Sequence, residues 1–205
     1  MAGLFRRLLG KDPGDPVIVV SGLPRSGTSM TMKMLEAGGV ELVVDGIRTA
    51  DEDNPKGYYE LERVKDLDKP GDKSWLREAR GKGVKIISFL LKDLPRENRY
   101  KVLFMTRHLD EVLASQTKML DRRGEDTETE DERMRDLYEN HLLQVKGMLS
   151  RKENFEALYI HYSDVLADGR PHAEKVAAFL GGGLDVDAMA GVVDQALYRN
   201  RSKGK

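Results

Sequence analysis

Residues 17–29 have the sequence VIVVSGLPRSGTS, and this stretch decides the fold class. Its first four residues form an apolar, β-branched run, which is typical of a strand buried on both faces. Gly22 and Gly27 bound a short loop, and residues 28–37 have the pattern of a helix that stops at two glycines. A strand, a glycine-bounded loop and a helix in this order predict a phosphate-binding loop, because loop amides and the positive helix end converge on an anion.

The rest of the chain alternates between strand and helix patterns. Further strands are expected at residues 40–44, 84–89, 100–106 and 158–162. Further helices are expected at residues 109–120, 132–152, after Pro171, and at 186–197. This alternation predicts an α/β, P-loop NTPase-like three-layer fold, in which helices flank a mostly parallel sheet of about four to five strands. We expect one domain over residues 1–205, because no repeat or linker divides the chain.

Composition excludes several function classes. The chain has 34 Lys and Arg against 35 Asp and Glu, so its net charge of -1 argues against a nucleic-acid partner. It has no cysteine, which excludes disulfides, thiolate metal sites and a cysteine nucleophile and suits a cytoplasmic protein. No apolar run approaches the roughly 18 residues of a membrane span, and the amphipathic N-terminus has no signal-peptide core.

The loop differs from the usual nucleotide triphosphate loop, Gly-x4-Gly-Lys-Ser/Thr. Both glycines and Ser29 fit that pattern, but Thr28 occupies the lysine position. The cation lies three residues earlier, where Arg25 offers a planar fork to an oxyanion. A strand–turn–helix junction without a ligand is the alternative, and the intact context and both hydroxyls favour ligand binding.

The loop sequence LPRSGTS resembles the 5'-phosphosulfate loop of the sulfotransferase family. The resemblance implies that the co-substrate is 3'-phosphoadenosine 5'-phosphosulfate and that no metal is required. It implies that Arg25 contacts the bridging and transferring groups of this donor. It also implies that Ser26, Gly27, Thr28 and Ser29 hold the 5'-phosphate through amides and hydroxyls.

A second family signature pairs an Arg at a strand end with a Ser eight residues later, which together hold the donor's 3'-phosphate. Arg107 and Ser115 have this spacing. Tyr162, in a Tyr-Ser-Asp stretch after a strand, resembles a family tyrosine that lies near the donor nucleotide. The resemblance extends over about residues 17–199, and segments 53–60 and 109–116 are similar to a bacterial branch of small sulfotransferase-like proteins.

An alcohol acceptor also needs a general base. Some family members use a histidine before the strand that carries the Arg, but this chain has no histidine before His108. Other members use a glutamate, for which Glu60 is the best candidate, with Glu62 and Asp51 as rivals. Arg25 and Glu60 are therefore the expected catalytic residues.

None of the four histidines is assigned as the base, and His141 and His172 are expected on helix surfaces. The acceptor is expected to be a small molecule or a carbohydrate with a hydroxyl or amine group. It should enter through segment 45–60 and the segment after Gly124, since these are the longest stretches without strand signals.

Two other classes remain as alternatives. A P-loop kinase for a small molecule would need a loop lysine and magnesium-binding carboxylates, and Thr28 argues against it. A non-catalytic nucleotide-binding or interaction protein on the same fold would be compatible with the missing histidine.

Overall fold

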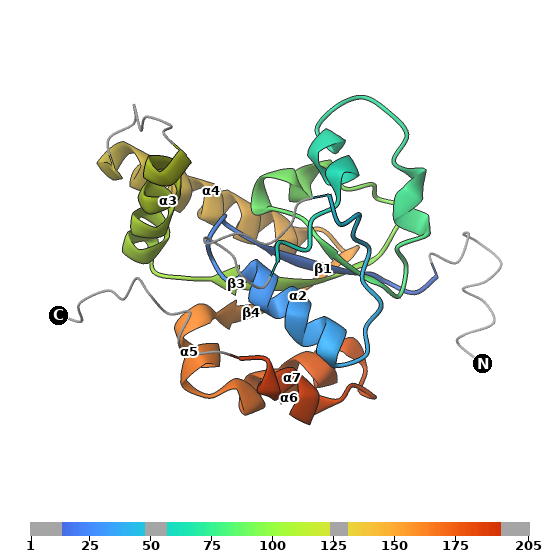
Figure 1. The fold of residues 1–205 in the computed structure, drawn as a ribbon. Coiled ribbons are helices and arrows are strands. Elements are labelled where there is room, and N and C mark those ends of the chain that lie inside the picture. The colour runs from blue at the N-terminus through green and yellow to red at the C-terminus, as the bar shows by residue number, and fades with distance from the viewer. Residues whose placement is uncertain (1–13, 48–56, 124–130, 194–205) are drawn as a thin grey trace.

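The computed structural model describes residues 14–47, 57–123 and 131–193. Its centre is a four-stranded parallel sheet with the order β2-β1-β3-β4 (Figure 1). The strands are β1 (Val17–Gly22), β2 (Gly83–Lys85), β3 (Tyr100–Thr106) and β4 (Phe155–His161). The predicted α/β fold with a parallel sheet is thereby confirmed.

The strand register brings the carboxyl ends of β1 and β3 together. Val17 pairs with Tyr100 at one end of these strands, and Gly22 pairs with Met105 at the other. The chain continues from β1 to β2 on one side, whereas β3 and β4 lie on the other side. In open α/β sheets a ligand binds at such a change of direction, just beyond the strand ends. The predicted phosphate loop follows β1 at this place.

Helices cover both faces of the sheet, as Figure 1 shows. The helices α2, α5, α6 and α7 lie on one face, and their bounds are Thr28–Ala37, Tyr162–Ala167, Gly169–Leu180 and Val186–Gly191. The helix α4 and three 3-10 helices lie on the other face, and their bounds are Asp131–Arg151, Glu62–Asp66 (η1), Ser74–Arg77 (η2) and Ser88–Asp93 (η3). Helix α3 (Leu109–Arg123) packs beside α4 beyond the end of β3.

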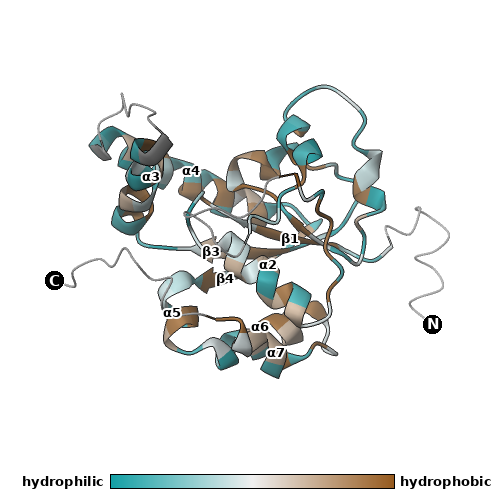
Figure 2. Ribbon diagram, in the orientation of Figure 1, coloured by the Kyte–Doolittle hydropathy of each residue, from teal (hydrophilic) through white to brown (hydrophobic). Residues whose placement is uncertain are grey.

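Two hydrophobic clusters fill the spaces between these layers. One joins β1 and β3 to α4 and the 3-10 helices, and the other joins the same strands to α2, α6 and α7. Figure 2 shows the apolar strands enclosed between helices whose outer faces are polar. Among the described residues, no helix is long and apolar enough to cross a membrane.

Two predicted strands were wrong in part. Residues 40–44 form only an isolated bridge, Leu42 to Gly83, because the two backbone hydrogen bonds that join them to β2, from the Val43 amide and to the Glu41 carbonyl, both involve Gly83. The strand predicted at 84–89 ends at Lys85, and η3 begins at Ser88. The backbone hydrogen bonds mark this end: the Ile86 amide still donates to the Val20 carbonyl of β1, whereas the Leu90 amide donates to the Ile87 carbonyl, as in a 3-10 turn.

We expect Gly27→Ala to destabilise the protein more than Gly39→Ala. Both glycines have positive φ angles, 101° and 92°, so each alanine carries left-handed strain of about 1–2 kcal/mol. A Cβ at Gly27 would also lie 2.5 Å from Cδ2 of the buried Tyr162 ring, whereas a Cβ at Gly39 would meet nothing within 4 Å. Urea unfolding of the two variants measures the difference, and equal losses of stability would contradict the close approach of Tyr162.

Candidate functional site

The loop after β1 forms a tight turn with two left-handed residues. The amide of Ser26 donates to the Leu23 carbonyl over 3.2 Å, and the Ser26 hydroxyl donates to the same oxygen over 2.7 Å. Arg25 has φ 68° and Gly27 has φ 101°. Arg25 is one of two non-glycine residues in the described chain with positive φ, and such strain is common at ligand sites. The loop leads into α2 at Thr28, so the positive end of that helix adjoins it.

Arg25 connects this loop to α3. Its Nε donates to Oγ of Ser115 over 2.9 Å, although the two residues are 90 positions apart. Ser115 is 5% exposed. The sequence placed Arg25 at one predicted phosphate site and Ser115 at the other, and the structure brings these two residues into direct contact.

Arg107 follows β3, and its side chain contacts the loop after β1, helix α3 and helix α5. Its Nε donates to Oε2 of Glu111 over 2.9 Å, and its Nη1 donates to the Arg25 carbonyl over 3.0 Å. Its guanidinium lies 4.5 Å from the centre of the Tyr162 ring, at the start of α5. The Arg107 and Glu111 side chains are only 7% and 1% exposed. The predicted group Arg25, Arg107, Ser115 and Tyr162 therefore lies in one place.

Glu111 is a site residue to which the sequence patterns assign no role. In the sequence it is only an acidic residue in the first turn of α3, where the helix dipole favours it. The signal that could have identified the pair is the four-residue spacing from Arg107, which places both side chains on one side of the helix start.

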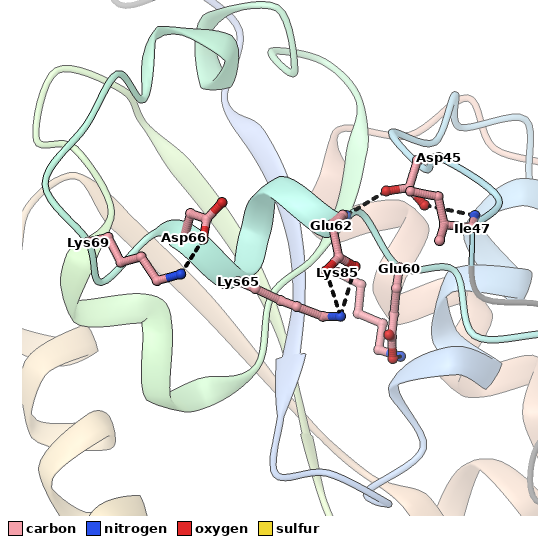
Figure 3. Close-up of polar contacts among 8 residues, drawn as sticks. All are labelled: Asp45, Ile47, Glu60, Glu62, Lys65, Asp66, Lys69 and Lys85. Carbon is pink, nitrogen blue, oxygen red and sulfur yellow. Dashed lines mark hydrogen bonds and ion pairs between the residues drawn. The ribbon is translucent and has the colours of Figure 1, made fainter.

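A third cation, Lys85, was also missed. It ends β2 with its side chain 9% exposed, and its Nζ donates to the Tyr58 carbonyl over 2.8 Å. The same Nζ lies 3.4 Å from Oε1 of Glu60 and 3.4 Å from Oγ of Ser29. Figure 3 shows the Lys85 and Glu60 side chains meeting. The predicted base Glu60 is thus beside the first turn of α2. The sequence signal that could have identified Lys85 is its position as a lysine inside an apolar strand pattern.

The rivals of Glu60 have other surroundings. Glu62 is 56% exposed and forms a surface ion pair with Lys65 (Figure 3). Asp51 lies outside the described residues. Next to Glu60, the Tyr59 hydroxyl donates to Glu36 over 2.9 Å, and burial together with this carboxylate raises the pKa of Tyr59 to about 12. Tyr59 therefore stays protonated at neutral pH.

The histidines differ from one another in their contacts. His108 is exposed and meets His161 edge to face, with ring centres 5.0 Å apart. His141 was expected on a helix surface; it is half-buried on α4, where its Nε2 lies 2.8 Å from Oγ of the buried Ser88 and its ring stacks on Phe89. Burial lowers the pKa of His141.

The hairpin of α3 and α4 packs directly on the loop. Leu23 shares a buried cluster with Val112 and Leu113 of α3 and Tyr138 of α4. The Tyr138 hydroxyl donates to Oε1 of Gln116 over 2.7 Å, one residue after the serine that binds Arg25. Helix α4 thus begins near the phosphate loop.

The acceptor entrance was predicted at segment 45–60 and at the segment after Gly124. Of these segments, residues 48–56 and 124–130 lie outside the described residues.

Three cations and a turn of backbone amides therefore surround one end of the sheet. Arg25, Arg107 and Lys85 come from three different elements. Such an arrangement suits a ligand that carries several oxyanion groups, because guanidinium and ammonium groups form charge-assisted hydrogen bonds with phosphate and sulfate. Among the described residues, no group of three or more His, Asp or Glu side chains could hold a metal ion.

A glycine-bounded loop that leads from β1 into α2 at the carboxyl edge of a parallel sheet is the layout of an α/β protein of the P-loop type. Residues 15–205 match the sulfotransferase domain, and the chain belongs to the sulfotransferase family. No curated protein has a significantly similar sequence.

Solved structures share the fold at low sequence identity. The sulfotransferase domain of the curacin biosynthetic pathway is 13% identical, with a TM-score of 0.57 over 93% of each chain. The sulfotransferase domain of the Synechococcus PCC 7002 olefin synthase is 16% identical, with a TM-score of 0.52 over 90% of this chain and 86% of that chain. Mouse sulfotransferase SULT7A1, solved as a complex with PAP, is 17% identical, with a TM-score of 0.55 over 88% of this chain and 62% of its own.

We expect Glu111→Gln to lower the free energy of unfolding by about 3–5 kcal/mol, because it removes the carboxylate that pairs with the buried Arg107 charge. Glu62→Gln is the matched control: it breaks an exposed pair with Lys65 and should cost about 0–1 kcal/mol. Chemical denaturation of both variants gives the two values. A loss at Glu111 no larger than the loss at Glu62 would contradict the structural role of this pair.

Proposed function

We propose that this protein transfers a sulfuryl group from 3'-phosphoadenosine 5'-phosphosulfate to a hydroxyl or amine acceptor. The observation that carries the proposal is the contact of Arg25 with Ser115 and of Arg107 with the Arg25 carbonyl. These contacts put two cationic sites next to each other, as a nucleotide with phosphate groups at both its 3' and 5' positions requires.

In this proposal, the loop binds the 5'-phosphosulfate end of the donor. The amides and hydroxyls of Ser26, Gly27, Thr28 and Ser29 hold the 5'-phosphate at the start of α2. Arg107 and Ser115 hold the 3'-phosphate, and Tyr162 lies against the face of Arg107 near the nucleotide. Membership of the sulfotransferase family and the binding of PAP by the structurally similar mouse SULT7A1 support this choice of ligand.

The same residues suit the chemistry of the transfer. As the bond from sulfur to the bridging oxygen breaks, negative charge develops on the leaving phosphate, and fixed cations stabilise that charge most in the transition state. In this proposal, Arg25 and Lys85 are the cations that stabilise it. Glu60, the base predicted from the sequence, also pairs with Lys85 and so holds the ammonium group beside Ser29.

The kinase alternative has less support. Thr28 occupies the position of the loop lysine, and Lys85 reaches the loop from β2 and contacts Ser29 from outside it. A non-catalytic nucleotide-binding protein would keep the same phosphate contacts. Donor turnover therefore separates it from an enzyme, and nucleotide binding alone does not.

We expect 3'-phosphoadenosine 5'-phosphate to bind more tightly than 5'-AMP, measured by calorimetry. The additional phosphate gains charge-assisted hydrogen bonds of about 1.5–3 kcal/mol, or roughly 10- to 150-fold in Kd. Ser115→Ala should reduce this preference, whereas Ser150→Ala on the exposed part of α4 should leave it unchanged. Equal affinities of the wild type for the two nucleotides would remove Arg107 and Ser115 from the site.

We expect Arg25→Ala to stay folded and to lose turnover of the donor by roughly 10²-fold or more, because it removes charge stabilisation from the leaving phosphate. Thr28→Ala should do less harm, since its backbone amide remains. Arg77→Ala, at an exposed arginine of η2, is the control for loss of positive charge. The measurement is release of the 3',5'-bisphosphate, with circular dichroism to verify folding. Full activity of Arg25→Ala would contradict the assignment of the phosphate loop.

A further inference from the structure

A series of contacts links both ends of the phosphate loop to η3 and α4. On one side, Arg25 of the loop binds Ser115, and the next residue, Gln116, binds Tyr138 of α4. On the other side, Lys85 approaches Ser29 at the opposite end of the loop. The chain then passes from Lys85 into η3, which packs against α4.

Phe89 and His141 complete this series between η3 and α4. The centre of the Phe89 ring lies 6.3 Å from the centre of the Tyr138 ring. It lies 3.8 Å from the centre of the His141 ring, and the Phe89 and His141 rings are nearly parallel, with an angle of 11° between them. His141 is one turn after Tyr138 and next to Leu142, which packs against the cluster that contains Leu23 of the loop. His141 is therefore connected, through Phe89, Tyr138 and Leu142, to the side chains that pack on the phosphate loop.

Ser88 orients the His141 ring. Ser88 is 1% exposed, and its Oγ lies 2.8 Å from His141 Nε2. When Nε2–H donates to this hydroxyl, Nδ1 carries the lone pair that can accept a proton. A base whose second nitrogen is held by a buried partner has the same arrangement as an oriented catalytic histidine.

We propose that His141 takes the proton of the acceptor during transfer, and that Glu60 instead holds Lys85 beside the loop. This inference rests on the proposed function. The O–H bond of the acceptor breaks, its proton goes to the imidazole, and its oxygen forms a new bond to sulfur. The bond from sulfur to the bridging oxygen breaks at the same time, and its electron pair stays on the departing 5'-phosphate. The imidazolium then releases its proton to water.

The electrostatic surroundings of His141 are compatible with this role. The residues one turn away on α4, at positions 137, 138, 144 and 145, are all uncharged. On η3, Lys92 and Asp93 pair with each other, 3.1 Å apart. Burial lowers the pKa of His141, so the ring is neutral, and able to accept a proton, at pH 7.

The pH dependence of turnover distinguishes His141 from Glu60. The assay follows release of the 3',5'-bisphosphate from the donor with water as the acceptor, between pH 5 and 8. A histidine base requires the neutral ring, so the rate should fall as the pH drops through a pKa below about 6.5. A carboxylate base would stay ionised over this range, because an ordinary Glu titrates near about 4.3.

His141→Gln keeps a hydrogen-bonding group for Ser88 and should lower the rate at pH 8 by roughly 10²–10⁴-fold. The fall of the rate at low pH, the acid limb of the profile, should disappear in this variant. Glu60→Gln should keep the limb. His172→Gln is the matched control, because His172 is also partly buried with its pKa lowered by burial but lies on α6, which covers the other face of the sheet. A limb that persists in His141→Gln, or bisphosphate binding with no donor turnover, would overturn the proposal.

Nuclear magnetic resonance titration gives a readout that does not depend on turnover. Binding of 3'-phosphoadenosine 5'-phosphate should raise the pKa of His141, because an anion nearby favours the charged ring, and should leave that of His172 unchanged. An unchanged His141 in a protein that calorimetry shows to be saturated would reject the role of His141 while the nucleotide site stands. No binding of the bisphosphate would reject the proposed function and this inference together.

Discussion

The buried ion pair of Arg107 and Glu111 is the interaction on which the rest of the site depends. Taking these two charges out of water costs several kcal/mol per ion, and their mutual attraction offsets this cost only with good geometry. Here the guanidinium also donates to the Arg25 carbonyl and lies over the Tyr162 ring. One side chain thus sets the position of the loop relative to β3, α3 and α5.

This dependence explains how the loop can keep a strained conformation. A non-glycine residue in the left-handed region, such as Arg25, persists only where its surroundings determine it. The Arg25 carbonyl is held by Arg107, and its side chain is held by Ser115. Arg25 is 82 positions from Arg107 and 90 from Ser115 in the sequence, but the parallel register of β1 and β3 brings all three residues to one edge of the sheet.

The fold was more predictable than the site, for a physical reason. The β-branched run at residues 17–20 and the turn at Gly22 depend on local preferences, so sequence periodicity was enough to find β1, α2 and β3. Glu111, Lys85 and His141 acquire their importance from partners that only tertiary packing supplies, as the contact between His141 and Ser88 shows. In the sequence, Glu111 and His141 look like ordinary surface groups of a helix.

Each cation at the loop already has a protein partner: Arg25 has Ser115, Lys85 has Glu60, and Arg107 has Glu111. In the proposed function, a phosphate group of the donor competes with these partners, so the free energy of binding is the difference between two sets of charge-assisted hydrogen bonds. A chain with net charge -1 gains little from general electrostatic attraction. Discrimination among anions must therefore come from the positions of these groups, and a ligand that satisfies all of them at once has the advantage over any single phosphate or sulfate.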